Sequence, residues 1–132
     1  MIPQDLKYTD EHEWIRLNGE NAEVGITHFA QQQLGDIVYV ELPAVGTSLT
    51  RGQTFGVVES VKTVSDLYAP VTGEVVEVNP ELLSEADDFK PELVNDDPFG
   101  QGWMVRVRLT DPSELAGLLD AAAYKKITEE AG

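Results

Sequence analysis

Short runs of β-branched and aromatic residues, separated by turn-forming residues, are the feature that most restricts how this chain can fold. Such runs are typical of strands, and a chain that repeats them at short intervals forms a sandwich or a flattened barrel. The runs lie at residues 14–17, 22–26, 37–40, 53–61, 63–69, 74–78 and 103–109. The first two flank Asn18 and Gly19, a strong signal for a hairpin turn. We therefore predict a mainly β fold.

Two of these strands have patterns that predict their burial. Residues 37–40 are apolar throughout, so we expect a largely buried strand that stops at Pro43. Residues 103–109 alternate between apolar and basic side chains, which is the pattern of a strand with one buried face. The expected inner face carries Trp103, Val105, Val107 and Leu109, and the outer face carries Arg106 and Arg108.

Helical signals lie between the strands and at the C-terminus. Thr27 is suited to cap a short helix that ends near Leu34, with Gly35 just beyond it. A single helical turn is expected near residues 81–85, in an acidic loop. These signals predict one short internal helix in a chain that is otherwise mainly β.

The C-terminus changes to a helical pattern over about residues 112–130. Asp111, which precedes a proline, is typical of a helix start. Apolar residues then recur at helical spacing, namely Leu115, Leu118, Leu119 and Ala122. Asp120 is expected to cap a second helix in which Tyr124 and Ile127 face inward. The two helices should lie against the sheets.

Length and charge restrict the number of domains and the possible partners. The 132 residues fit one domain, residues 1–132, with a single modest core. The formal net charge is −15, and only nine lysines and arginines are present, which argues against nucleic acid and anionic membranes as partners. The acidic surface has two interpretations, solubility or steering toward a basic partner, and both stay open.

Three absences in the sequence bear on chemistry and location. The chain has no cysteine, so any redox function must come from an attached cofactor. The N-terminus shows neither the basic region nor the apolar core of a signal peptide, and no apolar stretch approaches membrane-spanning length. We therefore expect a protein of the bacterial or archaeal cytoplasm.

Lys62 lies between two strand-like segments, and no other lysine occurs between Lys7 and Lys90. A turn at Val61 and Lys62 would hold the ammonium group clear of the surface, where a modifying enzyme could reach it. A lysine at a hairpin tip is also commonly a solvated charge that keeps strand edges from pairing. The residue type alone leaves both interpretations open.

Other candidate motifs lack the residues that their chemistry needs. His12 and His28 have no second histidine or cysteine at ligand spacing, so no metal site is expected. Ser60 lacks the glycines of a nucleophile elbow, and Asp87 and Asp88 lack the alternating acids of a calcium loop. The sequence therefore shows no self-sufficient active site, which fits a carrier.

The segment around Lys62 resembles the attachment hairpin of lipoyl and biotinyl carriers. Biotin carriers usually flank their lysine with methionines, whereas Val61 and Thr63 stand here, which favours lipoate. Beyond the hairpin, nearly the whole chain resembles the glycine cleavage system H protein family. The matching blocks are Tyr8, His12-Glu13-Trp14, Val24-Gly25-Ile26-Thr27, Leu34-Gly35-Asp36, Val40-Glu41-Leu42-Pro43, Pro91-Glu92-Leu93-Val94-Asn95, Asp97-Pro98-Phe99-Gly100 and Gly102-Trp103. Residues 80–90 depart from the pattern, because this stretch is a few residues longer than expected.

The resemblance implies a hybrid barrel-sandwich of the lipoyl-domain type with a helical C-terminus. It also implies lipoic acid joined to Lys62, which would carry the aminomethyl group of glycine. The implied partners are a pyridoxal-phosphate glycine decarboxylase (P protein), a tetrahydrofolate-dependent aminomethyltransferase (T protein), dihydrolipoamide dehydrogenase (L protein) and a lipoate ligase or lipoyl/octanoyl transferase. A carrier that presents one face to several enzymes is expected to be a monomer and not an enzyme itself.

Three acidic residues are candidates for supporting roles. Glu59 and Asp66 flank Lys62, where they are either solvated charges or features that the lipoylating enzyme recognises. The resemblance implies that Asp66 and Glu13 line a groove that holds the loaded arm. Glu13 has the equally weighted alternative of an exposed acid beside a buried Trp14.

Other functions stay open at this point. The chain could hold lipoate for onward transfer to 2-oxoacid dehydrogenases. It could also be an acidic binding module that keeps the fold without the cofactor, and a biotin carrier is a more distant alternative. Modification by a lipoate ligase would separate the lipoyl functions from the unmodified module.

Overall fold

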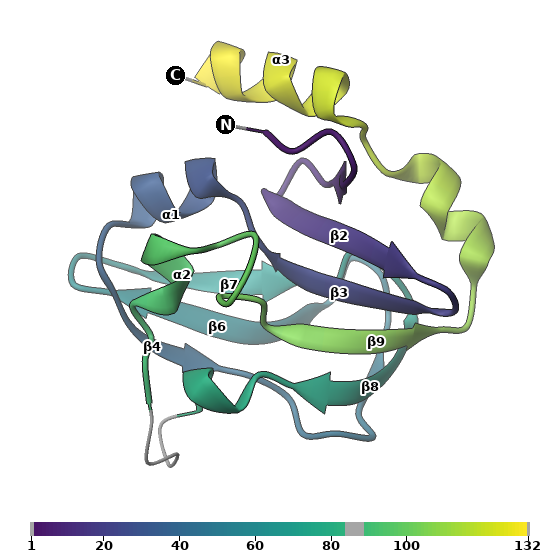
Figure 1. The fold of residues 1–132 in the computed structure, drawn as a ribbon, viewed down its shortest axis with the longest axis horizontal. Helices are drawn as coiled ribbons and strands as arrows, with labels where there is room; N and C mark the ends of the chain where they lie inside the picture. Colours follow the sequence, from purple (N-terminus) through teal and green to yellow (C-terminus); the bar gives the residue numbers. More distant parts are fainter. Residues whose placement is uncertain (1, 84–88, 132) are drawn as a thin grey trace.

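Figure 1 shows the computed structural model of the chain, which describes residues 2–83 and 89–131. Residues 84–88 of the long 80–90 stretch, with Asp87 and Asp88, lie outside the described residues. The strands are β1 (Lys7–Tyr8), β2 (Glu13–Asn18), β3 (Asn21–Ile26), β4 (Ile37–Glu41), β5 (Ser48–Leu49), β6 (Thr54–Ser60), β7 (Val64–Tyr68), β8 (Gly73–Val78) and β9 (Val105–Leu109). The helices are α1 (His28–Leu34), α2 (Leu93–Asp96) and α3 (Ala121–Ala131), with 3₁₀ turns η1 (Pro80–Leu82) and η2 (Pro112–Gly117).

The strands form two antiparallel sheets, which confirms the predicted mainly β architecture. One sheet has the order β1-β2-β3-β9-β8-β5, and the other has the order β4-β6-β7. Apolar side chains from both sheets bury one another in the main core, among them Val24, Val40, Val58, Val75 and Val107. This burial is the principal source of stability. In the described part of the chain, no helix is long and apolar enough to cross a bilayer.

The hairpin of β2 and β3 forms as the sequence predicts. Gly19 in its turn has a φ of 64°, a conformation that glycine adopts without strain. Trp14 lies opposite Gly25, and a Cβ at Gly25 would come within 2.7 Å of the indole ring. The buried indole donates a hydrogen bond of 2.9 Å to the carbonyl of Pro98. The glycine thus makes room for the tryptophan.

A second cluster of buried side chains lies beneath α3. Its members are Leu6, Tyr8, Trp14, Ala121 and Tyr124. The rings of Tyr8 and Tyr124 stack with their centroids 4.7 Å apart. Asp120 caps α3 as predicted, because its carboxylate accepts a hydrogen bond of 2.8 Å from the Ala123 amide. This second cluster attaches the C-terminal helix to the edge of the larger sheet. Figure 1 shows α3 lying beside the edge of the sheet that carries β2.

The prediction of a first C-terminal α-helix is wrong. The chain forms the 3₁₀ turn η2, which ends at Gly117, and the Asp111 side chain makes no capping hydrogen bond. Leu119 instead pairs with Tyr8, and their backbone groups exchange two hydrogen bonds of 2.8 Å. The sheet edge satisfies the backbone groups that a longer helix would have used.

Two strand predictions also need correction. Val38 is 45% exposed, so the strand from Ile37 is only partly buried; a register irregularity between Ile37 and Tyr39 turns it outward. Trp103 precedes the start of β9 and does not follow its alternation, because its ring lies 4.0 Å from the guanidinium of Arg106. The sequence analysis also missed β1, β5 and α2, which are too short for a periodic pattern.

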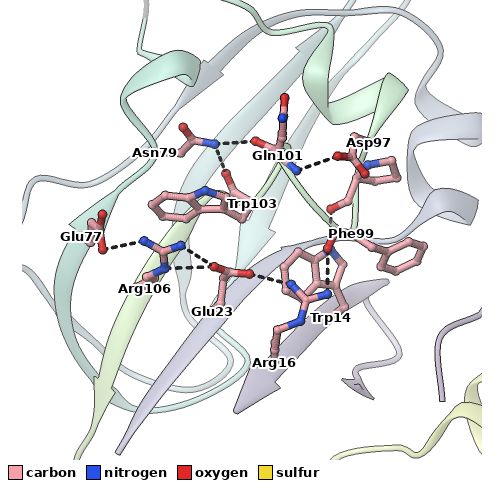
Figure 2. A network of polar contacts seen from close by, with 11 residues as sticks. Trp14, Arg16, Glu23, Glu77, Asn79, Asp97, Phe99, Gln101, Trp103 and Arg106 are labelled. Carbon is pink, nitrogen blue, oxygen red and sulfur yellow. Dashed lines mark hydrogen bonds and ion pairs between the residues drawn. The ribbon is translucent and has the colours of Figure 1, made fainter. Parts of the chain in front are cut away.

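Arginines and acids pair across the outer face of the larger sheet (Figure 2). Arg16 contacts Glu23 at 2.7 Å, and Arg106 contacts Glu23 at 2.8 Å and Glu77 at 2.7 Å. Each pair is partly exposed, so each contributes about 1 kcal/mol at most. This ladder neutralises part of the acidic surface and fixes the neighbouring strands relative to one another.

Candidate functional site

Lys62 lies in the turn between β6 and β7, and its side chain is exposed. The two strands pair in antiparallel register up to Glu59 and Val64. The turn therefore projects beyond the end of a paired ladder. An amine in this position is open to an enzyme that approaches from solvent.

Ser60 organises the turn around Lys62. Its side chain is 8% exposed, and its hydroxyl oxygen accepts hydrogen bonds from the amides of Lys62 (3.3 Å) and Thr63 (3.1 Å). The Ser60 amide also donates a 2.8 Å hydrogen bond to the carbonyl of Thr63. Three backbone groups of the turn are thus held by one residue, which gives the lysine a defined base. The sequence analysis missed this role, although a serine two residues before a turn lysine is a recognisable signal.

The end of α1 supports the same turn from the side. Thr27 caps this helix through a 3.2 Å hydrogen bond from the Ala30 amide, and Gly35 follows with a φ of 85°, as predicted. The Val61 amide donates a 3.0 Å hydrogen bond to the carbonyl of Asp36. A Cβ at Gly35 would lie 3.4 Å from Cε of Lys62, so the lysine stem lies over the glycine.

A groove of about 350 Å³ lies between α1, β7 and the start of β2, and we call it the arm groove. Its lining residues are Glu11, His12, Glu13, Ile26, Phe29, Ala30, Gln33, Leu34, Val58, Ser65, Asp66 and Leu67. Glu13 and Asp66 thus line one groove, and their expected role in holding a loaded arm stays a prediction. Glu59 lies on β6 outside this lining, and Asp66 is exposed. The apolar residues suit an aliphatic chain, and the acids suit a cation at its end.

Glu13 is the buried acid of the arm groove. It is 2% exposed, so the interpretation of Glu13 as an exposed acid is wrong. One carboxylate oxygen accepts a 2.8 Å hydrogen bond from the Thr9 hydroxyl, and the other accepts a 3.2 Å hydrogen bond from the Tyr68 amide. Burial raises the pKa of Glu13 to about 7, because the charged form loses its hydration. The group can therefore hold or release a proton near neutral pH.

His12 forms the neighbouring part of the groove wall, a role that the sequence analysis did not assign. Its φ of 69° is uncommon for a residue other than glycine. Nδ1 lies 2.8 Å from the hydroxyl of Tyr124, which lies 2.7 Å from the hydroxyl of Thr27. Burial lowers the pKa of His12, which favours the neutral ring. Within the described residues, no group of three or more potential ligands could hold a metal ion.

The site combines two features with different chemistry. The hairpin tip presents a primary amine that an enzyme can acylate. Residues of the same hairpin line part of the arm groove, which offers apolar walls and a protonatable carboxyl group. An acylated lysine with a long arm could therefore move between solvent and a protected place on the same protein.

Comparisons with known proteins find relatives of nearly the whole chain. The family model described as glycine cleavage H-protein matches residues 6–131. The chain is 59% identical to the glycine cleavage system H protein of Symbiobacterium thermophilum over 129 residues, which are 98% of this chain and 97% of that protein. It is 56% identical to the probable glycine cleavage system H protein of Haloarcula marismortui, over 94% of each chain.

A solved structure matches the fold as well. The crystal structure of a glycine cleavage system H protein from Mycobacterium marinum superposes with a TM-score of 0.81 at 44% identity, covering 95% of this chain and 97% of that one. This agreement over nearly all of both chains supports the hybrid barrel-sandwich that the sequence predicts.

Proposed function

This chain belongs to the glycine cleavage H-protein family, and we propose that it carries lipoate as an amide on Lys62. The family is a carrier component of the glycine cleavage system rather than an enzyme. In the proposed cycle the carrier receives the aminomethyl group of glycine at the pyridoxal-phosphate decarboxylase. It delivers this group to the tetrahydrofolate-dependent aminomethyltransferase. Dihydrolipoamide dehydrogenase then reoxidises the dithiol of the carrier.

The observation that carries this proposal is the exposed position of Lys62 on a turn that several backbone hydrogen bonds hold in place. Bound lipoate would supply a disulfide that accepts the one-carbon unit and two electrons. The chain itself supplies the attachment amine, the rigid turn and the groove. Attachment also raises the local concentration of the arm at each partner's active site.

Glu13 and Asp66 are proposed to hold the cationic end of the loaded arm in the arm groove. Because burial raises the pKa of Glu13 to about 7, a substantial fraction of this carboxyl group is protonated in the empty groove at neutral pH. A cation beside Glu13 would lower this pKa, because opposite charges favour the ionised carboxylate. Docking of the loaded arm would thus release the proton and form a charge-assisted contact shielded from water.

The remaining surface is proposed to serve recognition. Glu59 and Asp66 stand near Lys62, where a lipoate ligase or lipoyl/octanoyl transferase would contact them. The net charge of −15 would steer the carrier toward basic surfaces on its partner enzymes. We propose that residues 1–132 act as one monomeric carrier domain in the cytoplasm.

Reconstitution of glycine cleavage tests this function. The lipoylated chain is combined with the three purified partner enzymes, glycine, tetrahydrofolate and the electron acceptor of the dehydrogenase, and released ammonia is measured. We expect ammonia to depend on both the chain and its lipoylation. Efficient lipoylation without any ammonia would reject the glycine cleavage function and favour a lipoyl relay to 2-oxoacid dehydrogenases.

A further inference from the structure

Asn95 on α2 uses its whole amide group to hold one short stretch of the chain. Its side-chain oxygen accepts a 2.8 Å hydrogen bond from the Ile37 amide. Its side-chain nitrogen donates hydrogen bonds of 2.9 Å to the carbonyl of Gly35 and 2.9 Å to the side chain of Gln31. One acceptor and two donors are what an asparagine side chain offers, and aspartate or leucine cannot reproduce the set.

The stretch that Asn95 holds is the one that supports the lysine turn. Gly35 and Ile37 lie on either side of Asp36, whose carbonyl accepts the hydrogen bond from the Val61 amide. Gly35 also lies beneath the stem of Lys62. Asn95 is therefore connected to the lysine turn through a single backbone segment, although it lies 33 positions further along the sequence.

The Asn95 contacts are made where the backbone changes direction. The chain leaves α1 at Gly35 with a φ of 85° and enters β4 at Ile37. The Gly35 amide closes the helix through a 2.9 Å hydrogen bond to the carbonyl of Gln31. Without Asn95, the Gly35 carbonyl and the Ile37 amide would lose these partners, and the segment would gain freedom to move.

We propose that Asn95 is a positioning residue for lipoyl attachment, which holds the end of α1 so that the turn presents Lys62 in one orientation. This inference rests on the proposed function of Lys62. A ligase must align the lysine amine with its activated lipoyl group, and a misplacement of about 1 Å can cost a reaction up to about 100-fold. Loss of Asn95 should therefore slow attachment without unfolding the protein.

The chain offers a closely matched control in Asn79. Its side chain also forms three hydrogen bonds. It donates to the carbonyls of Gln101 (2.8 Å) and Trp103 (2.7 Å), as Figure 2 shows, and accepts from the Glu81 amide (3.2 Å). Asn79 is more deeply buried than Asn95, so its loss should destabilise the protein at least as much. These contacts join β8 to the segment before β9 rather than supporting the lysine turn.

The experiment compares Asn95→Ala with Asn79→Ala and the unchanged chain. Initial rates of lipoylation by a lipoate ligase with ATP and lipoate are measured by intact mass, well below the Tm of each variant. We expect kcat/KM to fall by at least about tenfold for Asn95→Ala and to stay within twofold for Asn79→Ala. Equal kcat/KM values for Asn95→Ala and the unchanged chain would overturn the inference.

A second measurement follows the turn directly. Hydrogen exchange at the Val61 amide should accelerate in Asn95→Ala and stay unchanged in Asn79→Ala, because only the first variant removes the contacts that hold Gly35 and Ile37 on either side of Asp36. Equal acceleration in both variants would also overturn the inference. If Asn95→Ala does not fold, Asn95→Asp replaces it, since aspartate keeps the acceptor for the Ile37 amide and removes both donors. Failure of the unchanged chain to accept lipoate would instead reject the proposed function of Lys62, and Val61 exchange would still decide whether Asn95 holds the turn.

Discussion

The lysine turn and the arm groove are built in different ways. The turn is formed by neighbouring residues, with Ser60 holding the amides of Lys62 and Thr63. The arm groove is assembled from segments far apart in the sequence, namely 11–13, 26–34, 58 and 65–67. A candidate modification site can thus be recognised in one continuous stretch, whereas a groove assembled from distant segments becomes visible only after folding.

The two regions also differ in their connection to the core. Lys62 is exposed, so its side chain contributes little to packing. In the groove, His12 contacts Tyr124 of the second cluster. Ile26, Val58 and Leu67, which also line the groove, belong to the main core. A change at Lys62 should therefore affect function alone, and changes in the groove should affect function and stability together.

The largest expected effect comes from Lys62→Arg. The guanidinium keeps the positive charge but does not accept a lipoyl group from the ligase, so carrier activity should be lost completely. The free energy of unfolding should change by less than about 0.5 kcal/mol, because the side chain is exposed. Ammonia release and denaturant unfolding check both parts. Substantial glycine cleavage by this variant would reject the assignment of Lys62.

The next effect concerns the stability of the groove as a function of pH. The pKa of Glu13 rises from 4.5 to about 7 on folding, so the folded state binds this proton more tightly than the unfolded chain. The stabilisation by protonated Glu13 is complete below pH 4.5 and is lost as the pH rises through about 7. The loss amounts to about 3 kcal/mol at most.

Glu13→Gln should remove this dependence. Glutamine can keep both hydrogen bonds, because its oxygen accepts from the Tyr68 amide and its nitrogen donates to the Thr9 hydroxyl. Urea unfolding between pH 4.5 and 8 should show the variant gaining stability relative to the unchanged chain as the pH rises. If the free energies of unfolding of the variant and the unchanged chain vary in parallel with pH, the assignment of a buried, titrating Glu13 is contradicted.

A smaller effect is expected from Tyr124→Phe. Phenylalanine keeps the ring that stacks on Tyr8 but loses the hydroxyl between His12 and Thr27. The free energy of unfolding should fall by about 1 to 2 kcal/mol. Lipoylation of Lys62 should keep its rate, because the turn does not use this hydroxyl. A slower lipoylation rate, measured where both proteins are fully folded, would show that the two regions are coupled.

The smallest effect is expected from Glu59→Gln. Glu59 lies beside the lysine turn and outside the arm groove, so its charge should act only on encounter with the lipoylating enzyme. The lipoylation rate at low salt should fall by about twofold, and the difference should vanish at high salt. Intact-mass measurements on reactions quenched at set times, at two salt concentrations, check this. A salt-independent loss would indicate a direct contact instead.

Sequence patterns predicted the parts of the fold that depend on neighbouring residues. The turn at Gly19, the cap at Thr27 and the cap at Asp120 each follow from local backbone chemistry. The pairing of Leu119 with Tyr8 was not predictable in this way, because its partner lies more than a hundred residues away. Tertiary hydrogen bonding there replaced a helix that the spacing of leucines favours.

The same division applies to the site. Lys62 and its neighbours are recognisable in the sequence, and Glu13 and Asp66 were expected from the resemblance to the family. The burial of Glu13 and the position of His12 in the groove wall depend on how β2, α1 and α3 pack, and no local sequence pattern contains this information. Asn95 belongs to a block that matches the family, but its contacts with Gly35 and Ile37 appear only in the folded chain.

The most direct test of this account is the intact mass of the chain after incubation with a lipoate ligase, ATP and lipoate, followed by peptide mapping. We predict a gain of one lipoyl group, located on Lys62 and absent from Lys62→Arg. A folded chain that gains no mass, or gains it on another lysine, would contradict the central claim.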